Sequence, residues 1–253
     1  MKVIAITQAR YGSSRLPGKV LKTIQGKTLL QIHLDRACKS RKIIKLIVAT
    51  TVEEEANDIA ILSAKLGFTS FRGSVNDVLD RFFQAIQGEN ADYVVRLTSD
   101  CPLIDPELID KIIQYTIDKK LDYCSNTLNP KYPDGQDVEV FRLSALKQAW
   151  TEAKLSSERE HVTPYIWKNS SFKGGVLFKS DNFDEGYSFG HLRMTIDDQN
   201  DFEVINAIVA DKGFDCTWLE YAIYLDKNQK LKELNAASER NEGYDKSIRK
   251  ESN

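Results

Sequence analysis

A short apolar strand that runs straight into a basic, glycine-containing loop is the most constraining feature of this sequence. The apolar run at residues 3–6 leads into a loop at residues 8–19. That loop carries the cations Arg10, Arg15 and Lys19, the hydroxyls of Ser13 and Ser14, and the glycines Gly12 and Gly18. Phosphate oxygens favour permanent cations and backbone N–H groups that no Cβ shields. We therefore expect a polyphosphate-binding loop at the carboxyl end of a first parallel strand.

The spacing of this loop differs from two common phosphate-binding motifs. Five residues separate Gly12 from Gly18, and Val20 stands where a P-loop carries Ser or Thr. The sequence also lacks G-x-G-x-x-G, so a dinucleotide site is not indicated. A solvated basic turn is the alternative to a phosphate site.

The composition is that of a soluble globular protein, with 28% charged and 42% hydrophobic residues in a chain of 253. A formal net charge of −2 does not favour nucleic-acid binding through a basic surface. No apolar run approaches the length of a membrane span, and the start MKVIAITQAR reads as a strand rather than a signal peptide. The four cysteines lie far apart, so we expect a reduced, cytoplasmic protein without a zinc site.

Strand-like and helix-like segments alternate in the first half of the chain. We expect strands at 2–8, 44–50, 69–72 and 93–97, and helices at 28–39, 53–66, 76–87 and 106–119. Asn76 is the expected N-cap of the helix at 76–87. This alternation predicts an α/β fold with a mostly parallel sheet flanked by helices.

Residues 127–191 break the alternation. After a loop with several Pro and Gly residues, we expect an antiparallel strand near 137–141, helices at 144–154 and 158–168, an antiparallel strand near 173–179, a strand at 192–196, and a helix at 201–212 capped by Asn200. From about Asn235 the chain is polar and is expected to be disordered. We therefore expect one domain over residues 1–234, with an insertion at 127–191 and a tail at 235–253.

Two acidic motifs follow predicted strands and are candidates for a metal site. Asp100 comes directly after the strand at 93–97, on the same sheet edge as the loop at 8–19. Asp197 and Asp198 come just before the helix at 201–212. Carboxylates at such an edge can hold Mg²⁺, which prefers oxygen ligands and bridges carboxylates to phosphates. Capping of a turn or helix is the alternative at each position.

Residues 4–19 resemble the N-terminal signature of the cytidylyltransferases that make CMP-activated acid sugars, the CMP-sialic acid and CMP-KDO synthetases. That signature reads roughly (I/P)-x-A-R-x-x-S-x-R-[LF]-P-G-K, and this chain reads ITQARYGSSRLPGK. Gln8 in place of the family's Pro makes the chain similar to the SpsF group, named for spore-coat polysaccharide biosynthesis. The similarity covers residues 2 to about 210. It implies a Rossmann-like fold of the nucleotide-diphospho-sugar transferase type.

The resemblance implies roles for particular residues. Arg10, Arg15, Lys19 and Asp100 would be catalytic, and Asp100 and Asp197 would hold Mg²⁺, although Asp198 and Gln199 depart from the family's Thr and Pro. The segment 71–79 resembles the loop that closes over the cytosine ring, with helix capping and a solvated Arg as the alternative. The nucleotide-binding candidates are Gln8, Ala9, Arg10, Ser13, Ser14, Arg15, Lys19, Arg72, Ser74 and Asp77.

The expected function is CTP-dependent nucleotidyl transfer to an acidic sugar or related anionic acceptor, with release of pyrophosphate, for cell-surface or spore-coat polysaccharide. A glycosyltransferase of the GT-A type is one alternative, but it would usually carry D-x-D where this chain reads Ser99-Asp100-Cys101. A non-catalytic nucleotide-binding protein is another, and the presence of Arg15, Lys19 and Asp100 speaks against it. Small molecules, rather than nucleic acid or membrane, are the expected partners.

Three further side chains and one segment have open roles. His161 could act on substrate, lie at a subunit contact or be merely structural, and Arg96 and Arg193 could bind an anionic acceptor or form internal ion pairs. The insertion at 127–191 pairs two subunits in relatives, so the resemblance implies a homodimer. A monomer with a covering flap is the alternative. The aromatic residues expected to be exposed there are Tyr132, Tyr165, Trp167, Phe172 and Phe178.

Overall fold

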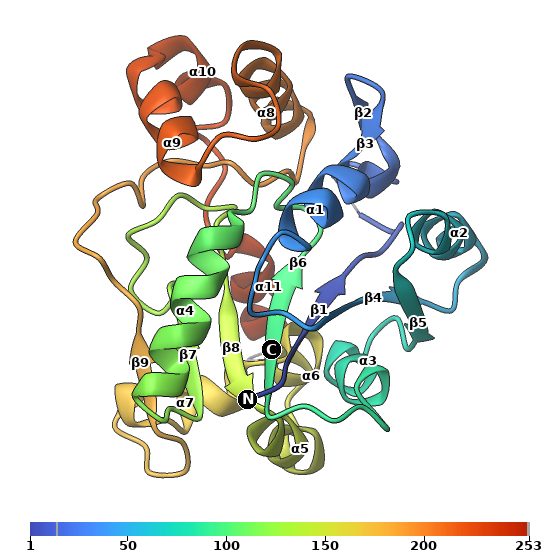
Figure 1. The fold of residues 1–253 in the computed structure, drawn as a ribbon, viewed down its shortest axis with the longest axis vertical. Coiled ribbons are helices and arrows are strands. Elements are labelled where there is room, and N and C mark those ends of the chain that lie inside the picture. The colour runs from blue at the N-terminus through green and yellow to red at the C-terminus, as the bar shows by residue number, and fades with distance from the viewer. Residues whose placement is uncertain (14, 252–253) are drawn as a thin grey trace.

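A seven-stranded sheet forms the centre of the computed structural model, which describes residues 1–13 and 15–251 (Figure 1). Its strands are β1 (Val3–Gln8), β4 (Lys45–Thr51), β5 (Thr69–Gly73), β6 (Tyr93–Thr98), β7 (Tyr123–Ser125), β8 (Glu139–Arg142) and β9 (Ser180–Asn182). They lie in the order β5-β4-β1-β6-β8-β7-β9, and β8 alone runs against its neighbours. A separate antiparallel pair joins β2 (Thr23–Ile24) and β3 (Lys27–Thr28).

Helices flank this sheet, so the predicted α/β fold class is confirmed. The α-helices are α1 (Leu29–Ala37), α2 (Asn57–Lys65), α3 (Val78–Ala85), α4 (Pro106–Asp118), α5 (Leu143–Glu152), α6 (Ser156–His161), α7 (Pro164–Lys168), α8 (Gln199–Lys212), α9 (Trp218–Lys227), α10 (Gln229–Leu234) and α11 (Glu242–Glu251). Short 3-10 turns are η1 (Lys19–Leu21), η2 (Glu54–Ala56) and η3 (Ser171–Lys173). Helices α8, α9 and α10 gather at one end of the molecule (Figure 1). No helix among the described residues has the length and apolarity that crossing a bilayer requires.

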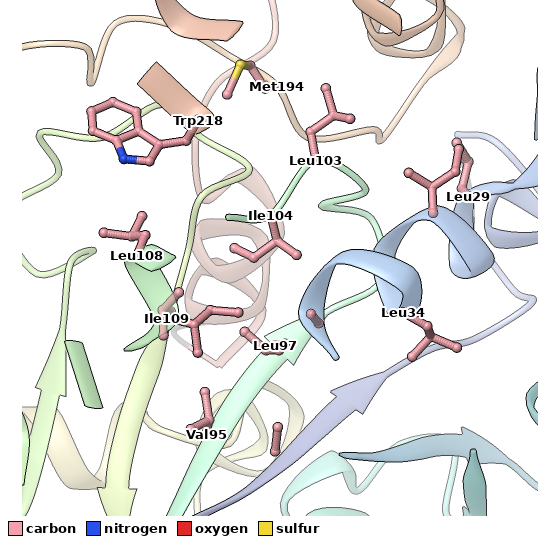
Figure 2. Packing of buried hydrophobic residues seen from close by; sticks show 14 of the residues in the cluster. Leu29, Leu34, Val95, Leu97, Leu103, Ile104, Leu108, Ile109, Met194 and Trp218 are labelled. Carbon is pink, nitrogen blue, oxygen red and sulfur yellow. The ribbon is translucent and has the colours of Figure 1, made fainter. Parts of the chain in front are cut away.

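The central strands are buried on both faces, as expected of a covered parallel sheet. Along β1, Val3 and Ala5 belong to one hydrophobic cluster, whereas Ile4 and Ile6 belong to the cluster on the opposite face. The first cluster includes side chains from β6, from the loop that follows it, from α1 and from α4, together with Trp218 of α9 (Figure 2). This packing fixes the loop after β6 between the sheet and the C-terminal helices.

The topology brings two loops together at one edge of the sheet. β1 pairs in parallel with β4 on one side and with β6 on the other, and the last residue of β1, Gln8, is in register with Thr98. The chain therefore leaves β1 and β6 at adjacent points of the same sheet edge. The connection after β1 leads to β4 on one side, and the connection after β6 leads to β7 on the other side. Open α/β sheets bind ligands at such a switch point.

Two expected helix caps are wrong by one or two residues. Asp77, not Asn76, caps α3, and its carboxylate accepts a hydrogen bond from the backbone N–H of Asp80 at 2.8 Å. Asp198 caps α8 by accepting from the N–H of Asp201, and Asn200 lies within the first turn. In both segments several neighbouring residues have side chains that can cap a helix, and contacts made in the fold determine which of them does so.

The second half differs from expectation in four places. β7 was not predicted, and β9 lies at Ser180–Asn182 and pairs in parallel with β7, so the antiparallel strand expected near 173–179 is wrong. Residues 192–196 form no strand and make only an isolated bridge between Asp134 and Arg193. The helix expected at 158–168 is divided into α6 and α7 at Val162, whose φ is 73°. Gly135 is required beside the bridge, because a Cβ there would come within 2.5 Å of the Met194 carbonyl carbon.

The chain beyond Asn235 is also ordered differently from expectation. The predicted disorder is wrong for residues 242–251, which form α11. No residue of this helix is buried, and polar contacts together with the ring of Tyr244 hold it to the rest of the molecule. One of these contacts, between Glu242 and Arg15, lies at the sheet edge where the chain leaves β1.

Candidate active site

Lys19 joins the two acidic motifs at the carboxyl edge of the sheet. Its ammonium lies 3.0 Å from a carboxylate oxygen of Asp100 and 2.9 Å from one of Asp197, and it donates to the carbonyl of Ile196 at 2.7 Å. Asp100 follows β6, Asp197 precedes α8, and Lys19 begins η1. Three segments far apart in the sequence thus converge. The sheet-edge argument predicted this for Lys19 and Asp100, whereas Asp197 was placed there only by the family resemblance.

The charges in this cluster stabilise one another. Burial alone would raise the pKa of the Asp100 carboxyl, but the neighbouring Lys19 outweighs it and holds that pKa below its ordinary value. Burial opposes ionisation of Asp197 in the same way, and Lys19 and Arg193 together hold its pKa well below the ordinary value. Both carboxylates are therefore ionised at neutral pH, and Lys19 retains its charge because its pKa is raised despite burial.

Backbone geometry shapes the loop at residues 8–19. Gly18 has a φ of 65°, donates its N–H to the Tyr11 carbonyl at 2.9 Å, and lies so close to the Tyr11 ring that a Cβ would approach it within 3.0 Å. The turn delivers Lys19 into the protein and leaves Arg15 at the surface of the site. Arg15 contacts Asp197 at 3.0 Å, with its side chain 34% exposed.

A cavity of about 680 Å³ opens beside this cluster. Six of the predicted nucleotide-binding residues line it: Gln8, Ala9, Arg10, Ser13, Arg15 and Lys19. Asp100 and Asp197 also lie on its wall. Ser14, the remaining candidate in the loop, falls outside the described residues.

The structure does not bring Arg72, Ser74 and Asp77 to the cavity wall. Arg72 donates to the carbonyls of Thr51 and Glu53, and so fastens the turn after β4. The hydroxyl of Ser74 accepts from the N–H of Asp77, while the Asp77 carboxylate caps α3 and pairs with Arg159 at 2.6 Å. These contacts agree with the alternative to a cytosine-binding loop, in which the segment 71–79 caps a helix.

Arg81 is a cavity residue that the sequence analysis missed. It lies on α3 among the buried apolar side chains, is 1% exposed, and donates from Nη1 to the carbonyl of Ser74 at 3.0 Å. Its Nε has no hydrogen-bond partner within residues 1–13 and 15–251. Burial, aided by the charge of Arg10, lowers the pKa of Arg81 to about 10. A buried, partly unpaired cation beside a second cation favours an anionic ligand. The sequence signal that could have identified Arg81 is a charged residue within the apolar face of a predicted helix.

Arg96 and Arg193, whose roles the sequence left open, lie on the cavity wall within ion pairs. Arg96 pairs with Glu139 and donates to the side chain of Gln8 at 3.2 Å. Arg193 is buried and pairs with Asp134 at 2.6 Å, with Asp201 and with Asp197 at 2.8 Å. Arg193 therefore positions Asp197, and it is committed to internal carboxylates.

His161 also lies on the cavity wall. Its Nε2 is 3.1 Å from the Ser247 hydroxyl, and its ring meets that of Tyr244 edge-on. Burial, with Arg96 nearby, lowers its pKa to about 4, so the ring is neutral at neutral pH. Its contacts tie α6 to α11.

His33 supports the loop that carries Asp100. From α1, its Nδ1–H donates to the Cys101 carbonyl at 2.9 Å, and Nε2 accepts from the Thr7 hydroxyl at 3.0 Å. The ring is fully buried, and burial lowers its pKa to about 4. The neutral imidazole thus fastens the turn after β6 to the end of β1.

The pH dependence of stability follows from His33. Its folded pKa lies below the unfolded value of 6.5, so the unfolded chain binds more protons as pH falls. The stability contributed is present above pH 6.5 and is lost toward pH 4, by on the order of 3 kcal/mol. Urea unfolding at several pH values should show a shallower decline for His33→Gln than for wild type. The exposed His191→Gln is the control, and parallel declines for wild type and His33→Gln would contradict this expectation.

The comparisons with known proteins agree with this geometry. A family model described as Cytidylyltransferase matches residues 4–246. "Uncharacterized protein MJ1063" of Methanocaldococcus jannaschii is 41% identical over 241 residues, covering 93% of this chain and 95% of that protein. "Spore coat polysaccharide biosynthesis protein SpsF" of Bacillus subtilis is 32% identical over 225 residues, covering 83% and 88%.

Solved structures show the same fold. A cytidylyltransferase from Leptospira borgpetersenii superposes with a TM-score of 0.85 at 31% identity, over 92% of this chain and 97% of that one. CMP:2-keto-3-deoxy-manno-octonic acid synthetase complexed with CTP gives a TM-score of 0.63 at 19% identity, over 84% and 100%. This chain belongs to the cytidylyltransferase family, and the predicted resemblance and CTP-dependent nucleotidyltransferase activity are confirmed.

Proposed function

We propose that this enzyme transfers CMP from CTP to an acidic sugar or a related anionic acceptor, releasing pyrophosphate, in the synthesis of a polysaccharide. The observation that carries this is the convergence of Lys19, Asp100 and Asp197 on one cavity beside Arg10 and Arg15. The name of the SpsF relative and the acid sugar in the name of the structural neighbour support the acceptor class. More specifically, we propose that the polysaccharide belongs to a spore coat, as the name of the SpsF relative suggests for that protein.

In this proposal the loop cations act on the triphosphate. An oxygen of the acceptor attacks the α-phosphorus, the bond to the bridging oxygen breaks, and the negative charge of the leaving group grows. Lys19, Arg10 and Arg15 lie where they can neutralise that charge, which is the main requirement in phosphoryl chemistry. Gln8, Ala9 and Ser13 line the same wall and are proposed to contact the nucleotide, with Ser14 as their neighbour in the sequence.

Asp100 and Asp197 fit a Mg²⁺ ion by the chemistry of their donors. Both offer ionised carboxylate oxygens on the wall of the cavity proposed to bind the triphosphate, and in this structure the Lys19 ammonium occupies the space between them. No group of three or more His, Cys, Asp or Glu suited to a metal occurs among the described residues, so an ion held by these two carboxylates would need its other ligands from phosphate and water. Such an ion would polarise the α-phosphate.

An acceptor screen tests the proposed function. Purified enzyme, CTP and Mg²⁺ are incubated with single acidic sugars and with phosphorylated sugars, and pyrophosphate release is measured. We expect release with at least one acidic sugar and a CMP-conjugate as the product. A CDP-conjugate from phosphorylated acceptors alone would contradict the proposed acceptor class but not the nucleotidyl transfer.

Nucleotide choice provides a separate prediction. CTP and UTP differ at the 4-position, where an amino group donates and a carbonyl accepts. A mispaired polar group costs on the order of 1–3 kcal/mol, so we expect CTP to be preferred over UTP by roughly ten- to a hundredfold in kcat/KM. ATP and GTP should be poorer still, because a pyrimidine pocket is small. Similar kcat/KM values for CTP and UTP would contradict a pocket that reads the base.

We further propose that the chain forms a homodimer through residues 127–191. Tyr132 and Phe178, expected to be exposed, are buried, whereas apolar side chains do reach the surface at 171–178. Val176 is 94% exposed and Leu177 is 49% exposed. We expect light scattering to report a dimer for wild type and a monomer for the double variant Val176→Asp, Leu177→Asp. Ile61→Asp, on the exposed face of α2, is the control, and a wild-type monomer at micromolar concentration would contradict the proposal.

The proposal places the reaction in the cytoplasm, where CTP is made and thiols stay reduced. All four cysteines are free in the structure. We also propose that residues 1–234 are one nucleotidyltransferase domain, with 127–191 as an insertion within it.

A further inference from the structure

The C-terminal segment lies along one wall of the active-site cavity. Residues 239–246 all line the cavity that Lys19 and Asp100 also line. This segment is far from the site in sequence and enters it only through the fold. No residue of α11 is fully buried, and the packing of its Tyr244 ring against His161 and Trp167 is edge-on, so apolar burial supplies only part of its attachment.

One contact of this segment involves a cation proposed to bind the triphosphate. Glu242, at the start of α11, forms an ion pair with Arg15. The two side chains are 32% and 34% exposed, and Lys246 forms a second pair with Glu242. A carboxylate of the protein therefore occupies Arg15, where phosphate oxygens are proposed to bind.

Other polar contacts hold the rest of the segment. Arg240 pairs with Asp137 and donates to the Tyr132 carbonyl at 3.1 Å, while its buried Nε has no partner among the described residues. The Ser247 hydroxyl donates to Glu160 at 2.8 Å. Glu251 accepts from the Ser157 hydroxyl at 2.9 Å. Partly exposed ion pairs and hydrogen bonds of this kind are individually weak.

The first residue of the segment, Asn235, is fixed by buried hydrogen bonds rather than by exposed ones. Asn235 is 4% exposed, and its amide donates to Asp201 at 2.9 Å and to the Arg193 carbonyl at 3.3 Å. The chain is thus anchored at 235 by buried contacts, and beyond it by mostly exposed polar contacts together with the Tyr244 ring, which meets the rings of His161 and Trp167 edge-on. Such a distribution lets the outer part detach while the anchor stays in place.

We propose that residues 236–251 form a displaceable strap, which closes the cavity in the free enzyme and is opened by a triphosphate that takes Arg15 from Glu242. This inference rests on the proposed role of Arg15 in triphosphate binding. The triphosphate brings several negative charges to a cation that Glu242 holds, and it also repels the second acidic side chain of the same helical turn, Asp245. Nucleotide binding therefore expels the strap rather than closing it.

Hydrogen exchange of the wild-type enzyme tests the direction of movement. Backbone amides of 242–251 are followed without ligand, with CTP, and with inorganic tripolyphosphate, which lacks the base and sugar. We expect exchange of these amides to quicken severalfold with either ligand, and amides near Asn235 to stay unchanged. Slower or unchanged exchange of α11 under saturating CTP would overturn the strap, and calorimetric CTP binding in the same sample would leave the proposed function standing.

Affinity measurements on matched variants test the contact itself. Glu242 and Asp245 both lie in the first turn of α11, so Glu242→Gln and Asp245→Asn remove the same charge from the same place in the helix. Of these two, Glu242 forms the ion pair with Arg15. We expect Glu242→Gln to lower the Kd for CTP and for tripolyphosphate about two- to fivefold, the effect of losing a partly exposed competing ion pair.

Three outcomes would overturn the strap in distinguishable ways. An equal fall in Kd for Asp245→Asn would reduce the effect to general charge. An unchanged Kd in Glu242→Gln would show that Glu242 does not compete with phosphate. Failure of both wild type and Glu242→Gln to bind CTP would remove the proposed function together with the inference.

Discussion

Replacing Lys19 by Met should lower kcat/KM for CTP by about 10²–10³-fold, the usual effect of deleting one charged donor that stabilises a transition state. Lys19 is the side chain that touches both acidic motifs, at 3.0 Å from Asp100 and 2.9 Å from Asp197. Met preserves the length and apolar stem but has no charge with which to hold phosphate oxygens. Pyrophosphate release at several CTP concentrations measures the effect.

Lys22→Met is the matched control for this experiment. It removes the same charge three residues along the chain, from a side chain that lies over the ring of Phe202 and not on the cavity wall. We expect its kcat/KM to stay near that of wild type. Equal activity in Lys19→Met and Lys22→Met would contradict a phosphate-binding role for the loop.

Lys19→Met should also lower the free energy of unfolding, although Lys19 lies in a basic, glycine-containing loop. Lys19 is in fact buried, with its side chain 9% exposed. Without it, Asp100 and Asp197 face each other unneutralised. We expect a loss of about 1–3 kcal/mol in urea unfolding, less than for a fully buried pair because both carboxylates are about 30% exposed. A melting temperature equal to wild type would contradict this.

The sequence predicts best what depends on chain order alone. A buried strand followed by a basic loop places Arg10, Arg15 and Lys19 at a sheet edge, and the same logic places Asp100 beside them. Those positions follow from the direction of parallel strands, and the structure has them in one cavity. Lys19 was correctly located, but its burial depended on Asp197, which is 178 residues away.

Choices between neighbouring residues are harder to predict. Asn76 and Asp77 can both cap a helix, and the selection of Asp77 coincides with its ion pair to Arg159, 82 residues away. Arg72 and Arg81 are both cations near the same loop. Their separation into a structural and a cavity residue depends on which face of β5 or α3 each occupies.

The prediction of disorder for residues 235–253 is wrong at α11 for a related reason. The polar composition of this segment is typical of disorder, because it lacks the apolar stripe that indicates a packed helix. The structure nevertheless holds α11 through pairs such as Arg15 with Glu242, whose partners are 227 residues apart. No local pattern can report contacts of that range.

Asp100→Asn and Asp197→Asn should each reduce turnover by at least about 10²-fold while sparing much of the nucleotide binding. Asn keeps the shape of the side chain but not the charge that, in the proposed site, would hold Mg²⁺ against the phosphates. CTP binding by calorimetry separates the two effects, since the loop cations remain in place. The apparent affinity for Mg²⁺, from activity titrations of the residual turnover, should fall in both variants.

Asp198→Asn decides whether the effect belongs to Asp197 in particular. Asp197 contacts Lys19 and lies on the cavity wall, whereas Asp198 caps α8 through the N–H of Asp201. Asn is also a competent N-cap, so Asp198→Asn should change stability by less than about 1 kcal/mol and leave kcat near wild type. Loss of turnover in Asp198→Asn with normal turnover in Asp197→Asn would reverse the assignment. Normal turnover in Asp100→Asn would show that the carboxylate after β6 serves only the fold.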